Sequence, residues 1–129
     1  CSSLTTFSTP LPKAEAMGYS WYNCSSLTDF SADVFTNWNP SSIGSGVFNL
    51  AWDGCTALTA QSVENILTSI DASGKYATST GASGGSALAD AGIDIDYNTA
   101  TGSLSAATNA AVTSLKAKGW SIIVNNVTL

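Results

Sequence analysis

The sequence predicts an α/β solenoid, a coil of parallel strands closed at its C-terminal end by a strand, a helix and a strand. Three observations support this prediction. A short phrase recurs along residues 1–71, a helical pattern follows its last copy, and an alternating strand pattern precedes a second helix near the C-terminus. The length of 129 residues suits one domain, since domains commonly hold about 100–200 residues.

The recurring phrase is centred on cysteine. Trp, Cys, Leu and Thr occupy the same offsets in W-Y-N-C-S-S-L-T-D-F (21–30) and W-D-G-C-T-A-L-T-A-Q (52–61). The chain opens on the second half of the phrase, C-S-S-L-T-T-F (1–7). The units therefore begin at the three cysteines, spaced 23 and 31 residues apart. We expect the matching apolar positions to fill the core: Cys1, Leu4, Phe7, Trp21, Cys24, Leu27, Phe30, Trp52, Cys55 and Leu58.

A repeat of 20–29 residues with Leu at a fixed position is typical of solenoids, whose stacked turns bury columns of equivalent side chains. The units resemble the BspA-like subfamily of leucine-rich repeats, with an aromatic residue three positions before Cys and Leu three positions after it. The resemblance covers residues 1 to about 70 and implies a short, irregular array of repeats with parallel strands. The C-terminal end is similar to units that end such arrays in phage tail-fibre and bacterial surface proteins. Because the common L-x-x-L-x-L-x-x-N pattern is absent, concave-face residues of better-known members have no counterpart here.

The N-terminal end of the predicted coil has no polar cap. Solenoid ends need polar caps to stay soluble, and C-S-S-L-T-T-F supplies none. We therefore expect upstream repeats or another subunit, which could be a second copy, to cover this end. A lipoprotein beginning at its modified Cys is the alternative interpretation of the first residue.

The second half predicts the elements that close the coil. Residues 59–71 have apolar side chains at helical spacing, and Thr59 can cap the first turn. A Gly- and Ser-rich segment, 72–92, is expected to be a flexible loop. The remainder, 93–129, predicts a strand at 93–97, a helix at 105–118 and a final strand from Trp120 toward Leu129. Ala107, Ala111, Val112, Leu115 and Thr108 are expected on the inner face of that helix. Two parallel strands joined by a helix form a right-handed crossover.

Composition excludes several classes of function. The net charge is −5, with four Lys and no Arg, so the basic stripe of a nucleic-acid-binding protein is missing. The sequence contains no apolar run of about 18 residues, so it predicts no membrane-spanning helix. Histidine is absent, which excludes His-assisted nucleophiles and the common zinc ligand sets that use His. The cysteines are too far apart for a zinc cluster, so we expect no metal, no cofactor and no enzymatic activity.

Asp94 and Asp96 are the one feature of the sequence that suggests an enzyme or a metal site. They fall on the same face of the strand at 93–97, and paired carboxylates can act as general acid and base in a carbohydrate enzyme or bind Ca²⁺. The wet face of an alternating strand has the same pattern. We expect these carboxylates to be solvated.

The candidate ligand-binding residues are Trp38, Tyr22, Asn37 and Asn39. Trp38 lies between two amides in a loop that the repeat does not need, and an exposed aromatic ring of this kind stacks on sugars or anchors protein contacts. The sequence therefore predicts a non-enzymatic recognition or adhesion module that binds a host-surface glycan or protein. We expect it at a virion surface, as the C-terminal part of a tail fibre, or at a cell surface, as part of a bacterial adhesin. A self-assembling virion protein, such as a decoration or filament subunit, is the alternative.

Overall fold

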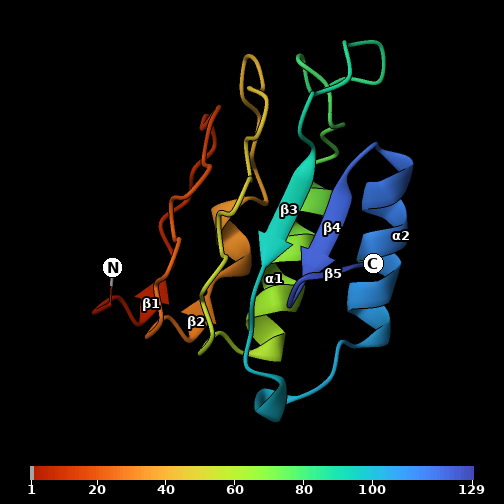
Figure 1. Ribbon diagram of the computed structural model, residues 1–129. Coiled ribbons are helices and arrows are strands. Elements are labelled where there is room, and N and C mark those ends of the chain that lie inside the picture. The colour runs from red at the N-terminus through yellow and green to blue at the C-terminus, as the bar shows by residue number, and fades with distance from the viewer. Residues whose placement is uncertain (1) are drawn as a thin grey trace.

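The computed structural model describes residues 2–129 (Figure 1). The first half contains two short strands, β1 (Thr6–Phe7) and β2 (Asp29–Phe30), and the 3-10 helix η1 (Ala32–Val34). The second half contains the longer elements: helix α1 (Ala60–Ala72), strand β3 (Gly92–Ile95), the 3-10 helix η2 (Thr99–Thr101), helix α2 (Ala106–Ala117), strand β4 (Ser121–Val124) and strand β5 (Val127–Thr128). Helices α1 and α2 pack against each other and run side by side in Figure 1.

The strands form two small sheets. In the first, β1 pairs with β2 in parallel. In the second, the order is β3-β4-β5, with β3 parallel to β4 and β4 antiparallel to β5. Helix α2 connects the parallel pair, so the predicted strand–helix–strand unit is confirmed.

Two turn-rich segments, 17–23 and 47–53, stack beside β3 without forming regular strands. Each is a run of tight turns, and every second N–H group of the first segment is directed at the second. Residues 17–23 donate to residues 47–53 through four backbone hydrogen bonds of 2.7–3.0 Å: Met17 to Val47, Tyr19 to Asn49, Trp21 to Ala51 and Asn23 to Asp53. The second segment donates in turn to the chain around β3, through Gly46 to Asp90 and Trp52 to Asp94. Figure 1 shows these segments in chain order, from orange through yellow to β3.

The two segments have the same backbone shape 31 residues apart. Tyr19 and Leu50 both have positive φ, 61° and 51°. Asn23 and Gly54 form the next such pair, with φ of 56° and 80°. Only glycine adopts this left-handed region without strain, and Asn tolerates it better than most residues. A side chain at Gly54 would also meet Asn23, because a Cβ there would lie 2.1 Å from Oδ1 of Asn23.

The core is rich in aromatic rings. Trp21 and Trp52 stack with centroids 5.1 Å apart and planes 6° apart. The rings of Phe30 on β2 and of Phe35, just after η1, pack edge-on against them. Of the residues expected in the core, these are buried: Trp21, Cys24, Leu27, Phe30, Trp52, Cys55 and Leu58. Leu4 and Phe7 are partly buried against them, and Cys1 lies outside the described residues.

The predicted solenoid of leucine-rich repeats is wrong. The described residues form two α-helices and short strands in two small sheets, one of which mixes parallel and antiparallel pairing. The physical reason is that the repeat is not sustained. Its two full copies form turns where a solenoid would have strands, and the segments that follow them differ, one containing η1 and the other α1.

The second half differs from its prediction at three places. The segment 72–92, predicted to be a flexible loop, folds back on itself: Thr78 and Ala87 form an antiparallel bridge, and Ala77 is buried. The expected inner face of the second helix is buried except for Ala107, which is exposed. The last strand stops at Val124, because two left-handed residues at 125 and 126 turn the chain back into β5.

Candidate functional site

Trp38 is not available to a ligand. Only 1% of its surface is exposed, and its ring contacts Phe48 at a centroid distance of 5.3 Å. Its indole N–H donates to the carbonyl oxygen of Ala14 at 2.7 Å. The prediction of an exposed Trp38 is therefore wrong, because the chain just before residue 15 folds alongside it and supplies the polar partner that the indole needs.

The other predicted ligand residues lie at the surface but do not form one site with Trp38. Asn37 and Asn39 are exposed on either side of the buried ring. Tyr22 is 39% exposed and packs edge-on against Tyr19, which is 55% exposed, at a centroid distance of 5.3 Å. The predicted ligand-binding cluster around Trp38 therefore does not form, and the exposed aromatic pair is Tyr19 and Tyr22.

Asp94 and Asp96 both accept hydrogen bonds from the neighbouring turn-rich segment. Asp94 is only 8% exposed, and its carboxylate accepts a hydrogen bond from the N–H of Leu50 at 2.7 Å. Asp96 accepts one from the N–H of Gly54 at 2.9 Å. Both carboxylates bind N–H groups of left-handed residues in the neighbouring segment. The prediction of a solvated carboxylate is wrong for Asp94, which is buried, whereas Asp96 is half-exposed.

Burial is the largest influence on the pKa values of Asp94 and Asp53. Burial raises the pKa of Asp94, the hydrogen bond from Leu50 opposes the rise, and the charges of Asp90 and Asp96 add to it. The pKa of Asp53 is raised by burial first and by the charges of Asp96 and Asp94 second. No group of three or more metal-ligating side chains within residues 2–129 is placed to hold a metal ion.

The two described cysteines are both fully buried. Cys24 is disulfide-bonded. Cys55 is free, and its thiol donates to the carbonyl oxygen of Trp21 at 3.0 Å. Burial raises the pKa of the Cys55 thiol to about 11, so at neutral pH it stays protonated and unreactive.

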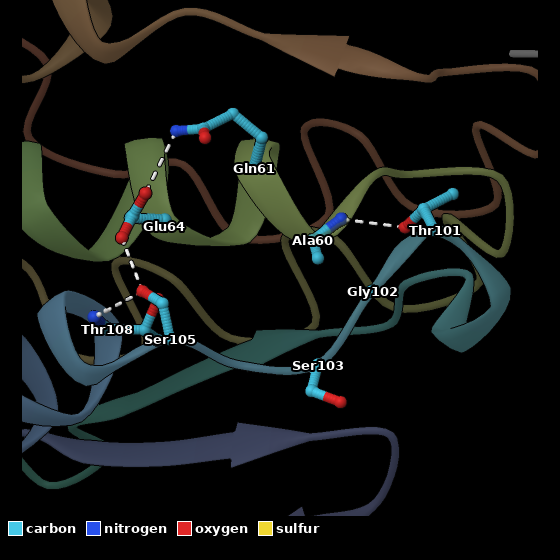
Figure 2. Close-up of a pocket in the computed structure, with 8 residues that line it drawn as sticks. All are labelled: Ala60, Gln61, Glu64, Thr101, Gly102, Ser103, Ser105 and Thr108. Atoms are coloured by element: carbon cyan, nitrogen blue, oxygen red, sulfur yellow. Dashed lines mark hydrogen bonds between the residues drawn. The ribbon is translucent and has the colours of Figure 1, made fainter.

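A pocket of about 220 Å³ lies at the N-terminal ends of α1 and α2 (Figure 2). Three helices begin near it, each with a side-chain N-cap: Thr59 caps α1, Ser105 caps α2 and Asn98 caps η2. The residues that line the pocket are Ala60, Gln61, Glu64, Thr101, Gly102, Ser103, Ser105 and Thr108.

The polar side chains of the pocket are joined by hydrogen bonds that cross between its walls. Glu64 on α1 accepts from the hydroxyl of Ser105 at 2.5 Å and from the amide of Gln61 at 3.0 Å (Figure 2). Ser105 in turn accepts from the N–H of Thr108 at 3.2 Å. On the other side, the hydroxyl of Thr101 accepts from the N–H of Ala60 at 2.9 Å. The lining thus offers hydroxyl, amide and carboxylate groups held in place by one another.

The loop that closes the pocket depends on a glycine. Gly102 has a φ of 146°, and a Cβ there would lie 3.5 Å from the Cβ of Ala60. This conformation lets the chain pass from η2 over the first turn of α1 to α2. Sequence reasoning found the cap at Thr59 but missed the pocket, because no local pattern indicates that residues 99–105 cross the start of α1.

Neither helix of the described chain has the length and hydrophobicity to span a bilayer. Comparisons of the chain with protein-family models, with curated proteins and with solved structures return no match.

Proposed function

We propose that this protein is a recognition module that binds a neutral, hydroxyl-rich ligand, such as a sugar residue of a glycan, in the pocket between α1 and α2. The observation that supports the proposal is the hydrogen-bonded set of Gln61, Glu64 and Ser105 in a pocket of about 220 Å³. The proposal places the protein at a virion surface or a cell surface, where it would meet such a ligand as part of a glycan.

The chemistry of the lining favours a hydroxyl-bearing ligand. A hydroxyl group both donates and accepts, so it can insert between the carboxylate of Glu64, which accepts only, and the amide of Gln61, which does both. A few polar groups at fixed positions are what gives a small-molecule site its orientation and specificity. The groups here are fixed because Ser105 and Thr101 are each engaged in a second hydrogen bond, to Thr108 and Asn98.

The test is saturation-transfer NMR of the full chain with a panel of neutral mono- and oligosaccharides at millimolar concentration. We expect saturation transfer to at least one sugar class, and its loss in the Glu64→Ala variant. Because Glu64 is not part of the buried core of α1, this variant should keep its folding, which circular dichroism would check. Asn37→Ala, an exposed amide outside the pocket, is the matched control. No transfer to any sugar, or transfer that Glu64→Ala leaves intact, would overturn the proposal.

A further inference from the structure

The backbone hydrogen bonds between the turn-rich segments run in one direction, from each segment to the one that follows it in the chain. Residues 17–23 direct their alternate N–H groups toward residues 47–53, which direct theirs toward the chain around β3. In a peptide unit the carbonyl points opposite to the N–H group that follows it. The carbonyl groups between these donors therefore point back toward the preceding segment.

The first segment consequently has a row of carbonyl groups on its outer edge. In the second segment, the equivalent carbonyls accept the hydrogen bonds from residues 17–23: Val47, Asn49, Ala51 and Asp53. Moving back by 31 residues gives the matching carbonyls of the first segment: Ala16, Gly18, Ser20 and Tyr22. All four residues are exposed, and no donor within residues 2–129 bonds to these four carbonyl oxygens. We call this row the acceptor edge.

The acceptor edge determines what can pair with it. The N–H groups of Ser20 and Tyr22 are already used within their own turns, bonding to Met17 and Tyr19. The edge therefore offers acceptors and needs a partner that offers donors at every second residue. Two copies of the folded chain cannot pair edge to edge, because carbonyl would face carbonyl.

We propose that the acceptor edge is a docking site for a segment of a partner polypeptide, which adopts the conformation of residues 17–23 and donates its alternate N–H groups to the four carbonyls. The contact would continue the pairing that already joins residues 17–23 to 47–53, with the same spacing and direction. Backbone pairing of this kind gives affinity, and neighbouring side chains give specificity.

The exposed tyrosines lie on the same segment. Tyr22 contributes a carbonyl to the acceptor edge, and Tyr19 lies between two other carbonyl residues of it. Tyr19 is 55% exposed and Tyr22 is 39% exposed, and their rings contact each other. Tyr is enriched at protein interfaces because its ring buries a large area while its hydroxyl keeps a polar partner. These two rings are therefore the side-chain part of the docking site.

The probe is a fluorescein-labelled peptide that copies residues 14–27, with Cys24→Ser to prevent disulfide exchange. It contains the donor segment that the structure already shows pairing with an equivalent row of carbonyls. The control is the same peptide with N-methyl groups on the Tyr19 and Trp21 amides, which removes two of the four donors. We expect fluorescence anisotropy to show binding to the full chain, weakened at least about tenfold by the methyl groups.

Two matched protein variants locate the binding. Ser20→Lys places a long cationic side chain on the acceptor edge and should weaken peptide binding, since charged side chains protect edges from pairing. Ala110→Lys adds the same charge on the exposed side of α2 and should leave binding unchanged. In wild-type protein labelled with ¹³C, the carbonyl resonances of the four edge residues should shift on titration, and Glu64→Ala should not alter the affinity.

Equal binding of the two peptides, no binding up to the solubility limit, or carbonyl shifts elsewhere would overturn the proposal. Concentration-dependent dimerisation of the chain that Ser20→Lys abolishes would assign the edge to a second copy, and this too would overturn it.

Discussion

The carboxylate of Asp94 on β3 accepts a hydrogen bond of 2.7 Å from the backbone N–H of Leu50, a residue with a φ of 51°. In the preceding segment the equivalent N–H, that of Tyr19, bonds to a backbone carbonyl, that of Asn49. A side chain has thus taken the place of a carbonyl where the turn-rich segments meet β3. Asp96 does the same for Gly54.

This relationship predicts how substitutions of Asp94 affect stability. Asp94→Ala should lower the free energy of unfolding by about 1–3 kcal/mol, because it leaves the Leu50 N–H without its partner. Asp94→Asn keeps an oxygen acceptor and removes a charge that burial disfavours, so its stability at pH 7 should equal or exceed that of the wild type. Urea unfolding followed by tryptophan fluorescence measures both. Equal destabilisation by Ala and Asn would contradict the role given to the hydrogen bond.

The raised pKa values of Asp53 and Asp94 predict a pH dependence of stability. Both are raised above the ordinary value of 3.8, so the folded state holds protons that the unfolded state has lost. The free energy of unfolding contributed by these groups therefore falls as the pH rises from 3.8 through the raised values. The double variant Asp53→Asn, Asp94→Asn should show a smaller fall over this window. Urea titrations at a series of pH values test the difference, and parallel curves for the two proteins would contradict the prediction.

The parts of the fold that the sequence predicted well are those that local chemistry decides. Helix α1 has apolar side chains at helical spacing and a Thr59 cap, and it was predicted to within one residue at each end. Helix α2, with Ser105 and Gly119 at its limits, was also found. The sequence repeat correctly aligned Trp21 with Trp52, because aromatic side chains at equivalent positions stack when their backbones pair.

What the sequence could not predict depends on contacts between distant segments. The alternating pattern at 93–97 has a wet face in isolation, but all four residues of β3 are buried in the fold. Strand β4 pairs along one edge of β3, and the segment 47–53 pairs along the other. Trp38 looked exposed because its neighbours are amides, whereas its burial depends on Ala14, 24 residues earlier. The pocket depends likewise on the crossing of residues 99–105 over α1, which no local pattern encodes.

The burial of Trp38 predicts a change in stability when it is substituted. Trp38→Ala removes a fully packed ring and a hydrogen bond to Ala14, so the free energy of unfolding should fall by about 3–5 kcal/mol. Asn37→Ala and Asn39→Ala, on exposed flanking residues, should change it by less than about 0.5 kcal/mol. Chemical unfolding of the three variants provides the comparison. A Trp38→Ala protein as stable as the wild type would show that the indole is not part of the core.

The buried thiol of Cys55 should be inert in the folded protein. Its pKa of about 11 leaves almost no thiolate at pH 8, and the thiolate is the species that alkylating reagents attack. Iodoacetamide at pH 8 should therefore modify Cys55 only when urea has unfolded the chain, which peptide mapping by mass spectrometry would detect. The destabilised Trp38→Ala variant should react faster than the wild type, because its unfolded state is more populated. Rapid modification of Cys55 in the native wild type would show that the packing around Trp21 opens far more readily than its burial implies.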